Sequence, residues 1–200
     1  MRKSKYLVLS SFYFDFNNDL SEITNVKELF ENQNILDLFR FDKLISIKES
    51  QFMKKKINFI YLSKNIETIN EDAFQGNQIQ ILDLSNCIKL KYIGVNAFNS
   101  NQIKQLKLPK NIEALSFASF AYNKIQNLDL SNCIKLKEIL SDAFSDNPLK
   151  EIKILGNIEI EYDNYYKKDI WNIFARYYND NNKKEGNYKL ENNEWKWYPL

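Results

Sequence analysis

The sequence of 200 residues contains no histidine. This absence excludes Ser-His and Cys-His nucleophile pairs, zinc sites that use histidine, and the commonest proton shuttle at neutral pH. Only four glycines and three prolines are present, which disfavours glycine-rich phosphate loops and low-complexity linkers. No apolar run reaches the length of about 18 residues that a transmembrane helix needs. We therefore expect no catalytic residue, no cofactor, no metal and no transmembrane segment.

A large excess of one charge is also absent. The chain has 28 basic and 26 acidic side chains, and its net charge of +2 gives no general electrostatic reason to bind nucleic acid or an anionic membrane. The run of lysines at 54–56 is isolated and is typical of a solvated edge. With 44% hydrophobic and 14% aromatic residues, the chain is expected to fold rather than to remain disordered.

The first residues, MRKSK followed by YLVLSSFYF, have the basic and then apolar order of a short signal peptide. They lack a small-x-small cleavage site, which favours a first strand of the domain instead. Unpaired thiols fit a reducing compartment at least as well as a secreted one. The sequence therefore leaves the compartment open between the cytoplasm and the cell surface or secretion.

The most informative feature is an internal repeat. A phenylalanine recurs every 22 or 24 residues, at Phe30, Phe52, Phe74, Phe98, Phe120 and Phe144. A small residue often precedes it, and an asparagine follows three positions later at Asn77, Asn101, Asn123 and Asn147. Apolar residues stand five, eight and ten positions after the phenylalanine, in an LxxLxL frame that would place Ile35 and Leu38 in the first repeat. A strand that recurs about every 23 residues predicts the stacked coils of a solenoid.

The return half of each coil has two versions. The 22-residue coils contain KNIETI at 64–69 and KNIEAL at 110–115, whereas the 24-residue coils contain SNCIKLK at 85–91 and 131–137. The two versions alternate, so the longer period is 46 residues. We expect these return segments to be short helical or irregular pieces.

The segments LKLPKNIEALSFASFAYNKI and LDLSNCIKLKYIGVNAFNSNQI resemble the BspA-like class of leucine-rich repeats. The resemblance spans about Phe30 to Leu155 and depends on AFxxN and LxL motifs that recur in phase. It implies a right-handed leucine-rich repeat solenoid of about six coils, and a bacterial or protist protein for interaction or adhesion. The sequence departs from the family pattern at Arg40, which stands where an apolar residue is expected.

The pattern divides the chain into three parts. We expect an irregular N-terminal coil or cap at 1–29, a solenoid of 22- and 24-residue coils at 30–156, and an aromatic-rich C-terminal cap at 157–200. The cap is predicted as a helix from Asp169 to Tyr178 and a β-hairpin that turns at Asn192 and Asn193. Such a cap would cover the apolar end that the last coil of a solenoid exposes.

Two repeated polar positions are interpreted as structural. Cys87 and Cys133 are equivalent residues two coils apart, and a spacing of about 4.8 Å for each coil separates them too far for a disulfide. We interpret them as small buried hydrophobic residues rather than reactive thiols. The four asparagines are predicted to form a turn ladder whose amides pair with backbone groups.

The outward side chains of the LxL strands form the predicted binding face for a protein partner. One row alternates in charge and is interpreted as a self-neutralising ladder of Tyr61, Asp83, Lys107, Asp129 and Lys153. The other row changes from apolar to acidic, through Phe59, Ile81, Gln105, Asn127 and Glu151. We expect Phe59, Tyr61 and Ile81 either to form a partner-binding hot spot or to lie under the N-terminal segment.

An alternative function depends on the C-terminal hairpin. Trp195, Trp197 and Tyr198 are similar to the aromatic hairpins of cell-wall-binding repeats, in which ring faces stack on sugars or cationic groups. The alternative is therefore a cell-wall or carbohydrate-binding protein. An enzyme is not expected, because the repeat spreads carboxylates along a ladder rather than into one pocket.

Overall fold

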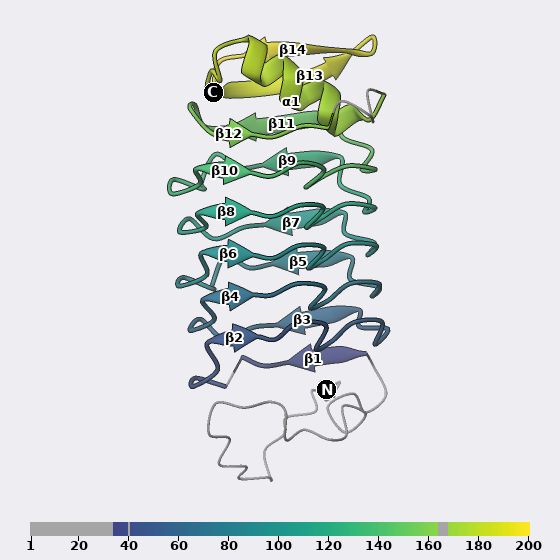
Figure 1. Ribbon diagram of the computed structural model, residues 1–200, viewed down its shortest axis with the longest axis vertical. Helices are drawn as coiled ribbons and strands as arrows, with labels where there is room; N and C mark the ends of the chain where they lie inside the picture. The colour runs from purple at the N-terminus through teal and green to yellow at the C-terminus, as the bar shows by residue number, and fades with distance from the viewer. Residues whose placement is uncertain (1–33, 40, 164–167) are drawn as a thin grey trace, which may run out of the picture.

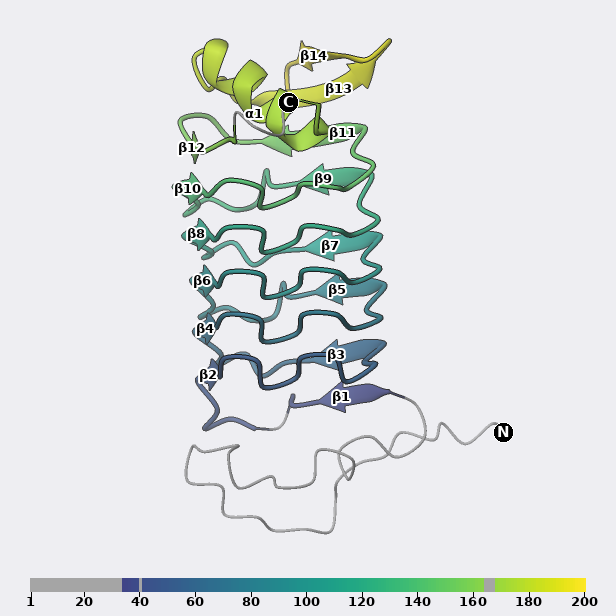
Figure 2. The same cartoon turned by 45° about the vertical axis from the view of Figure 1, so that its right-hand side comes forward.

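The computed structural model describes residues 34–39, 41–163 and 168–200. Stacked coils form two columns of short parallel strands, and Figures 1 and 2 show these columns on different sides of the molecule. The first column holds the LxL strands β1 (Ile35–Asp37), β3 (Phe59–Tyr61), β5 (Ile81–Asp83), β7 (Gln105–Lys107), β9 (Asn127–Asp129) and β11 (Glu151–Ile154). The predicted parallel-strand solenoid is therefore confirmed. Phe30, Arg40 and the signal-like N-terminal segment lie outside the described residues.

The return segments differ from the prediction, because each coil contains a second strand. These strands form one six-stranded parallel sheet of β2 (Ser46–Ile47), β4 (Thr68–Ile69), β6 (Tyr92–Ile93), β8 (Ala114–Leu115), β10 (Glu138–Ile139) and β12 (Glu159–Ile160). Each has one buried residue and one outward residue, which is too short for alternation to be visible in the sequence. The ladder continues to Ile160, beyond residue 156.

The first column shows the 46-residue period directly. Its backbone ladder joins β1 to β3, β5 to β7, and β9 to β11. In each of these pairs, a 24-residue coil is bonded to the 22-residue coil that follows it. Over the described coils, the ladder is interrupted between β3 and β5 and between β7 and β9. The pair of coils is therefore a structural unit and not only a sequence period.

The register of the first described coil differs from the prediction by two residues. The spacing from Phe30 predicts Leu38 opposite Ile60, but Leu36 pairs with Ile60 instead. Leu38 is buried and fills the apolar place that the sequence analysis had assigned to Arg40. The phase counted from Phe30 therefore does not apply to the first described coil.

Because of this shift, the first described coil is one of the 24-residue coils. The backbone N–H of Phe41 donates to the Leu38 carbonyl, in the same way that the N–H of Cys87 donates to the Leu84 carbonyl. Phe41 therefore occupies the turn position that Cys87 and Cys133 occupy in later coils. Long and short coils alternate from the first described coil onward.

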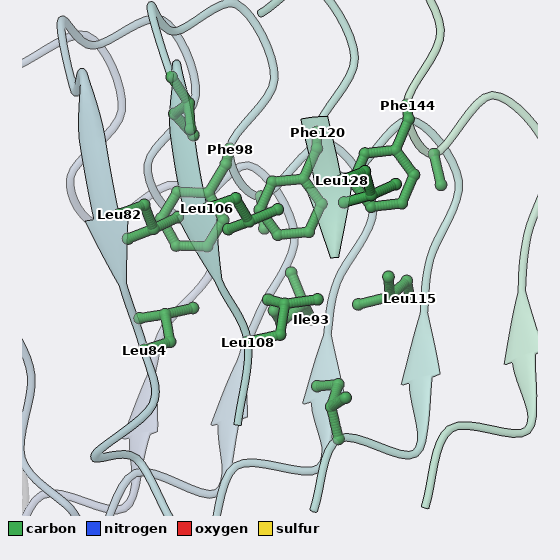
Figure 3. Packing of buried hydrophobic residues seen from close by; sticks show 14 of the residues in the cluster. Leu82, Leu84, Ile93, Phe98, Leu106, Leu108, Leu115, Phe120, Leu128 and Phe144 are labelled. Atoms are coloured by element: carbon green, nitrogen blue, oxygen red, sulfur yellow. The ribbon is translucent and has the colours of Figure 1, made fainter. Parts of the chain in front are cut away.

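The core is organised around the repeated phenylalanines. Phe52, Phe74, Phe98, Phe120 and Phe144 stack with successive ring centroids 5.2–5.4 Å apart. All five rings are buried, and Figure 3 shows three of them beside inward-pointing leucines of the LxL strands. Offset stacking of this kind adds to the free energy gained by burying the rings. One ring in each coil therefore forms a continuous spine along the solenoid.

The last coil is covered by the helix α1 (Ile170–Asp180) and by the hairpin of β13 (Gly186–Glu191) and β14 (Glu194–Tyr198) (Figure 1). Trp171 extends the aromatic spine, with its ring 5.0 Å from that of Phe144 in an edge-on arrangement. β13 pairs antiparallel with β11 and protects its edge from pairing with another chain. Asn192 and Asn193 adopt the positive φ angles, 51° and 66°, that the hairpin turn requires.

Candidate functional site

The outward face of the first column contains all ten residues of the predicted partner site. Eight are exposed, whereas Glu151 and Lys153 on β11 are half-buried. β13 causes this difference because it pairs with β11, and Asn187 on β13 donates to the Glu151 carboxylate at 2.8 Å. The cap therefore limits access to the C-terminal end of the face and leaves the N-terminal end open along the described strands.

At this open end lies the apolar patch, defined as Phe59, Tyr61 and Ile81. Phe59 is 43% exposed, Tyr61 49% and Ile81 48%. The patch spans β3 and β5, where the first column has no backbone ladder. Phe39 is also exposed. It lies near the patch, because the N–H of its neighbour Leu38 donates to the Tyr61 carbonyl. The N-terminal segment that was an alternative occupant of this surface lies outside the described residues.

The charged row next to the patch is paired within the fold at Asp83 and Lys107, whereas the described residues Asp129 and Lys153 form no ion pair with each other. Lys107 Nζ lies 3.3 Å from an Asp83 carboxylate oxygen on the adjacent strand. The same carboxylate accepts hydrogen bonds from the backbone N–H and hydroxyl of Ser85. Partial burial acts to raise the pKa of Asp83, but the bonds from Ser85 and the attraction of Lys107 outweigh it and lower the pKa. Asp83 is therefore both a turn-forming residue and the partner of a lysine.

The turn-forming role repeats in the other long coils. Asp129 accepts from the N–H and hydroxyl of Ser131, and Asp37 accepts from the N–H of Phe39. Each aspartate thus fixes the chain direction where its strand ends. An exposed ion pair such as Asp83–Lys107 adds only about 0.2–1 kcal/mol. The fold thus supplies partners for Asp37, Asp83, Lys107 and Asp129 on this face, whereas no such contact involves the apolar patch among the described residues.

The rings of Trp195, Trp197 and Tyr198 do not form one exposed surface, which differs from the aromatic site expected from the sequence. Trp195 is buried and packs edge-on against Phe174, with ring centroids 5.2 Å apart. Trp197 shares that inward face because side chains alternate along β14, and its ring is covered by Lys184 Nζ at 3.2 Å from the ring centroid. Tyr198 points to the opposite face and is exposed. A sugar could not stack on all three rings together.

The two cysteines are buried and free. Burial and the nearby Asp83 carboxylate raise the pKa of the Cys87 thiol to about 11. Burial and Asp129 likewise raise that of Cys133 to about 12. Both thiols are therefore protonated at neutral pH and are poor nucleophiles.

Two further features are absent from the described part of the chain. Its residues include no group of three or more cysteine or carboxylate side chains placed to hold a metal ion. No helix among them has both the length and the apolar character needed to cross a membrane.

A second charged row was missed in the sequence because its residues directly precede the short strands of the second column, which were not predicted. Glu113 lies between two lysines, 3.8 Å from Lys91 Nζ and 3.7 Å from Lys137 Nζ. These side chains line a shallow depression over β6, β8 and β10, together with Tyr92, Ala114 and Glu138. Opposite charges again alternate between neighbouring coils, so this row is also paired within the fold.

The repeated LxL strand, the stacked phenylalanine and the asparagine turn define the class of leucine-rich repeat solenoids. A family model for the BspA type leucine rich repeat region matches residues 45–171 in six copies, which is more than half of the chain. The chain belongs to this family. No curated protein and no solved structure matches it. The family suggests a repeat protein for protein interaction or adhesion, and its solenoids are generally non-catalytic.

Proposed function

We propose that the chain is a non-catalytic protein-interaction or adhesion module that binds its partner through the outward face of the first strand column. The apolar patch of Phe59, Tyr61 and Ile81 is the observation that carries this proposal. Three large side chains, each almost half exposed, lie on two neighbouring strands of a rigid solenoid. Exposed apolar clusters with a polar surround are typical of partner-binding sites.

The surroundings of the patch support this role. Asp83 and Lys107 lie beside it and already neutralise each other, so a partner that covers this pair would not separate the two charges. The short strands hold the three side chains in fixed directions, which lowers the conformational entropy lost on binding. Burying the exposed half of each side chain would contribute roughly 1 kcal/mol. The patch would then act as the centre of the interface, with Lys107 toward its rim.

The Trp195–Tyr198 hairpin is not proposed as a glycan site. Its largest ring, that of Trp195, packs in the cap core, and the ring of Trp197 is covered by Lys184. These contacts support a capping role for the hairpin.

The proposal can be tested with the triple variant Phe59→Ser, Tyr61→Ser and Ile81→Ser in the full chain. Its control is Gln105→Ser with Asn127→Ser, which changes polar residues of the same outward row. Both proteins should keep the wild-type circular dichroism spectrum, because all five side chains are exposed. Pull-down from bacterial and host-cell lysates, followed by mass spectrometry, should recover a protein with the wild type and the control but not with the triple variant. A partner captured equally by all three proteins would contradict the proposal.

A further inference from the structure

One edge of the solenoid carries one lysine in each of four consecutive coils. It is made by the turns that join the first strand column to the second, seen as stacked loops at the left of Figure 1. The lysine edge is defined here as Lys64, Lys89, Lys110 and Lys135. All four side chains are exposed. This edge does not include any residue of the apolar patch.

The backbone places these lysines in one stack of turns. Each turn closes with a hydrogen bond from a backbone N–H to the carbonyl three residues earlier. The donor and acceptor residues are Ile66 and Ser63, Leu90 and Cys87, Ile112 and Pro109, and Leu136 and Cys133. Lys64 and Lys110 therefore hold the second turn position, and Lys89 and Lys135 hold the third. Successive turns are tied together by the Asn111 amide, which donates to the Ile88 carbonyl at 2.7 Å. The rise is about 4.8 Å for each coil, so the four ammonium groups span about 14 Å.

The lysine edge is not neutralised by the part of the chain that the structure describes. None of its four lysines lies within ion-pair distance of a described carboxylate, whereas Lys91, Lys107 and Lys137 all have such partners. Stacking like charges on consecutive coils is unfavourable. The overall net charge of +2 conceals this local excess. A row of unpaired cations in fixed register is complementary to an anionic surface.

Two isoleucines project from the same edge. Ile88 is 50% exposed and Ile134 63%, and each holds the second turn position that Lys64 and Lys110 hold in the alternate coils. The edge therefore alternates cationic and apolar side chains along a ridge. A soluble polyanion would contact the lysines but would gain nothing from the isoleucines. A lipid surface would use both, since ammonium groups attract anionic headgroups and apolar side chains enter the interface.

We propose that the lysine edge docks the solenoid on a membrane surface rich in anionic lipid. The ridge would lie along the bilayer, with the lysines at headgroup level and Ile88 and Ile134 in the interface. The apolar patch and the docking ridge are separate surfaces, so one chain could bind a protein while it lies on a membrane.

Vesicle co-sedimentation tests this proposal with the full chain. The probes are vesicles of phosphatidylcholine alone and vesicles that also contain phosphatidylserine. The edge variant changes Lys64, Lys89, Lys110 and Lys135 to glutamine. The matched control changes Lys55, Lys104, Lys124 and Lys150 to glutamine, four exposed lysines outside these turns, and alters the net charge equally. A third variant changes Ile88 and Ile134 to serine.

We expect the wild type to bind only the vesicles with phosphatidylserine. The edge variant should bind at least about ten-fold more weakly, the control should bind almost as well as the wild type, and the isoleucine variant should bind several-fold more weakly. Absence of wild-type binding would overturn the proposal, as would equal losses in the edge variant and the control. Unchanged binding of the isoleucine variant to vesicles, together with edge-dependent binding to heparin, would assign the edge to a soluble polyanion instead. Circular dichroism of each variant separates loss of binding from loss of fold.

Discussion

The carboxylate of Asp169 accepts a hydrogen bond from the backbone N–H of Asp146 at 2.9 Å. In an earlier coil, the equivalent N–H of Tyr122 donates to the Ser145 carbonyl of the next coil. Asp169 therefore supplies the acceptor that one more coil would have supplied. The same carboxylate caps α1 by accepting from the N–H of Asn172. One side chain thus completes the solenoid and begins the helix that covers it.

Replacing Asp169 with alanine should destabilise the protein by about 2 kcal/mol. The change removes a helix cap, which is worth about 1 kcal/mol, and leaves the Asp146 N–H without its acceptor. Urea unfolding followed by tryptophan fluorescence measures the loss. Asp169→Asn should lose less, because asparagine also caps helices. The control Asp180→Ala, at an exposed site, should stay within about 0.5 kcal/mol of the wild type.

The asparagine ladder predicts a larger effect inside the solenoid. Asn123 accepts from the N–H of Ile103 and donates to the carbonyls of Phe98 and Phe120, so it joins two coils. Asn123→Ala would leave these buried backbone groups without hydrogen-bond partners and should lower the free energy of unfolding by about 2–4 kcal/mol. Asn127→Ala, at an exposed strand position, serves as the control in the same urea titration. Similar losses in both variants would show that the ladder has no special role.

A stabilising substitution is expected at Ser119. Its hydroxyl is buried without a hydrogen-bond partner, and the equivalent residues in other coils include Ala73, Ala97 and Ala143. Ser119→Ala should raise the free energy of unfolding by about 1 kcal/mol, because the folded state no longer desolvates an unpaired hydroxyl. Differential scanning calorimetry should show a higher Tm.

The matched substitution Ser116→Ala should have the opposite effect. Ser116 is also buried, but its hydroxyl donates to Tyr92 Oη at 2.5 Å. Removing it should lower the Tm. If both serine variants shifted the Tm in the same direction, hydrogen bonding would not explain the difference.

The buried thiols predict a loss of stability in alkaline solution. The pKa of Cys87 is about 11 and that of Cys133 about 12 in the folded chain, against an ordinary value of 9.0. As pH rises from about 9 to 11, the unfolded chain releases these protons first, so the free energy of unfolding falls. Urea midpoints at pH 8 and pH 10 measure the slope.

The double variant Cys87→Ala and Cys133→Ala should reduce this slope. It should not abolish it, because burial also raises the pKa of Tyr178 and Tyr188 and acts in the same direction. An unchanged slope would mean that the pKa of each thiol is not raised in the folded chain. Native thiol labelling at pH 8 should likewise be slow until denaturant is added.

The parts of the fold that recur in phase were predictable from the sequence. The phenylalanine spine, the asparagine turns and the buried cysteines each repeat a chemical requirement of the coil, so spacing alone revealed them. The helix and hairpin of the cap were also found, through helical spacing around Trp171 and a turn at Asn192 and Asn193.

The parts that were missed lack a constant period or depend on packing. The two-residue strands of the second column are too short to show alternation. Phe30 matched the phenylalanine spacing and misled the register of the first coil. The lysine edge was hidden because long and short turns separate its residues by unequal steps. The burial of Trp195 depends on packing against Phe174 of α1, which the spacing of residues does not reveal.

The alternation of long and short turns also sets the unit by which such a chain can grow or shrink. Each short turn is fitted to the long turn below it, as when the Asn111 amide reaches the Ile88 carbonyl, and the first strand column is bonded in the same pairs. Removing a single coil would bring two turns of one kind into contact and leave such amides without acceptors. Removing residues 82–127, one full pair, would rejoin matching turns. Duplication and deletion in this solenoid are therefore expected to proceed two coils at a time.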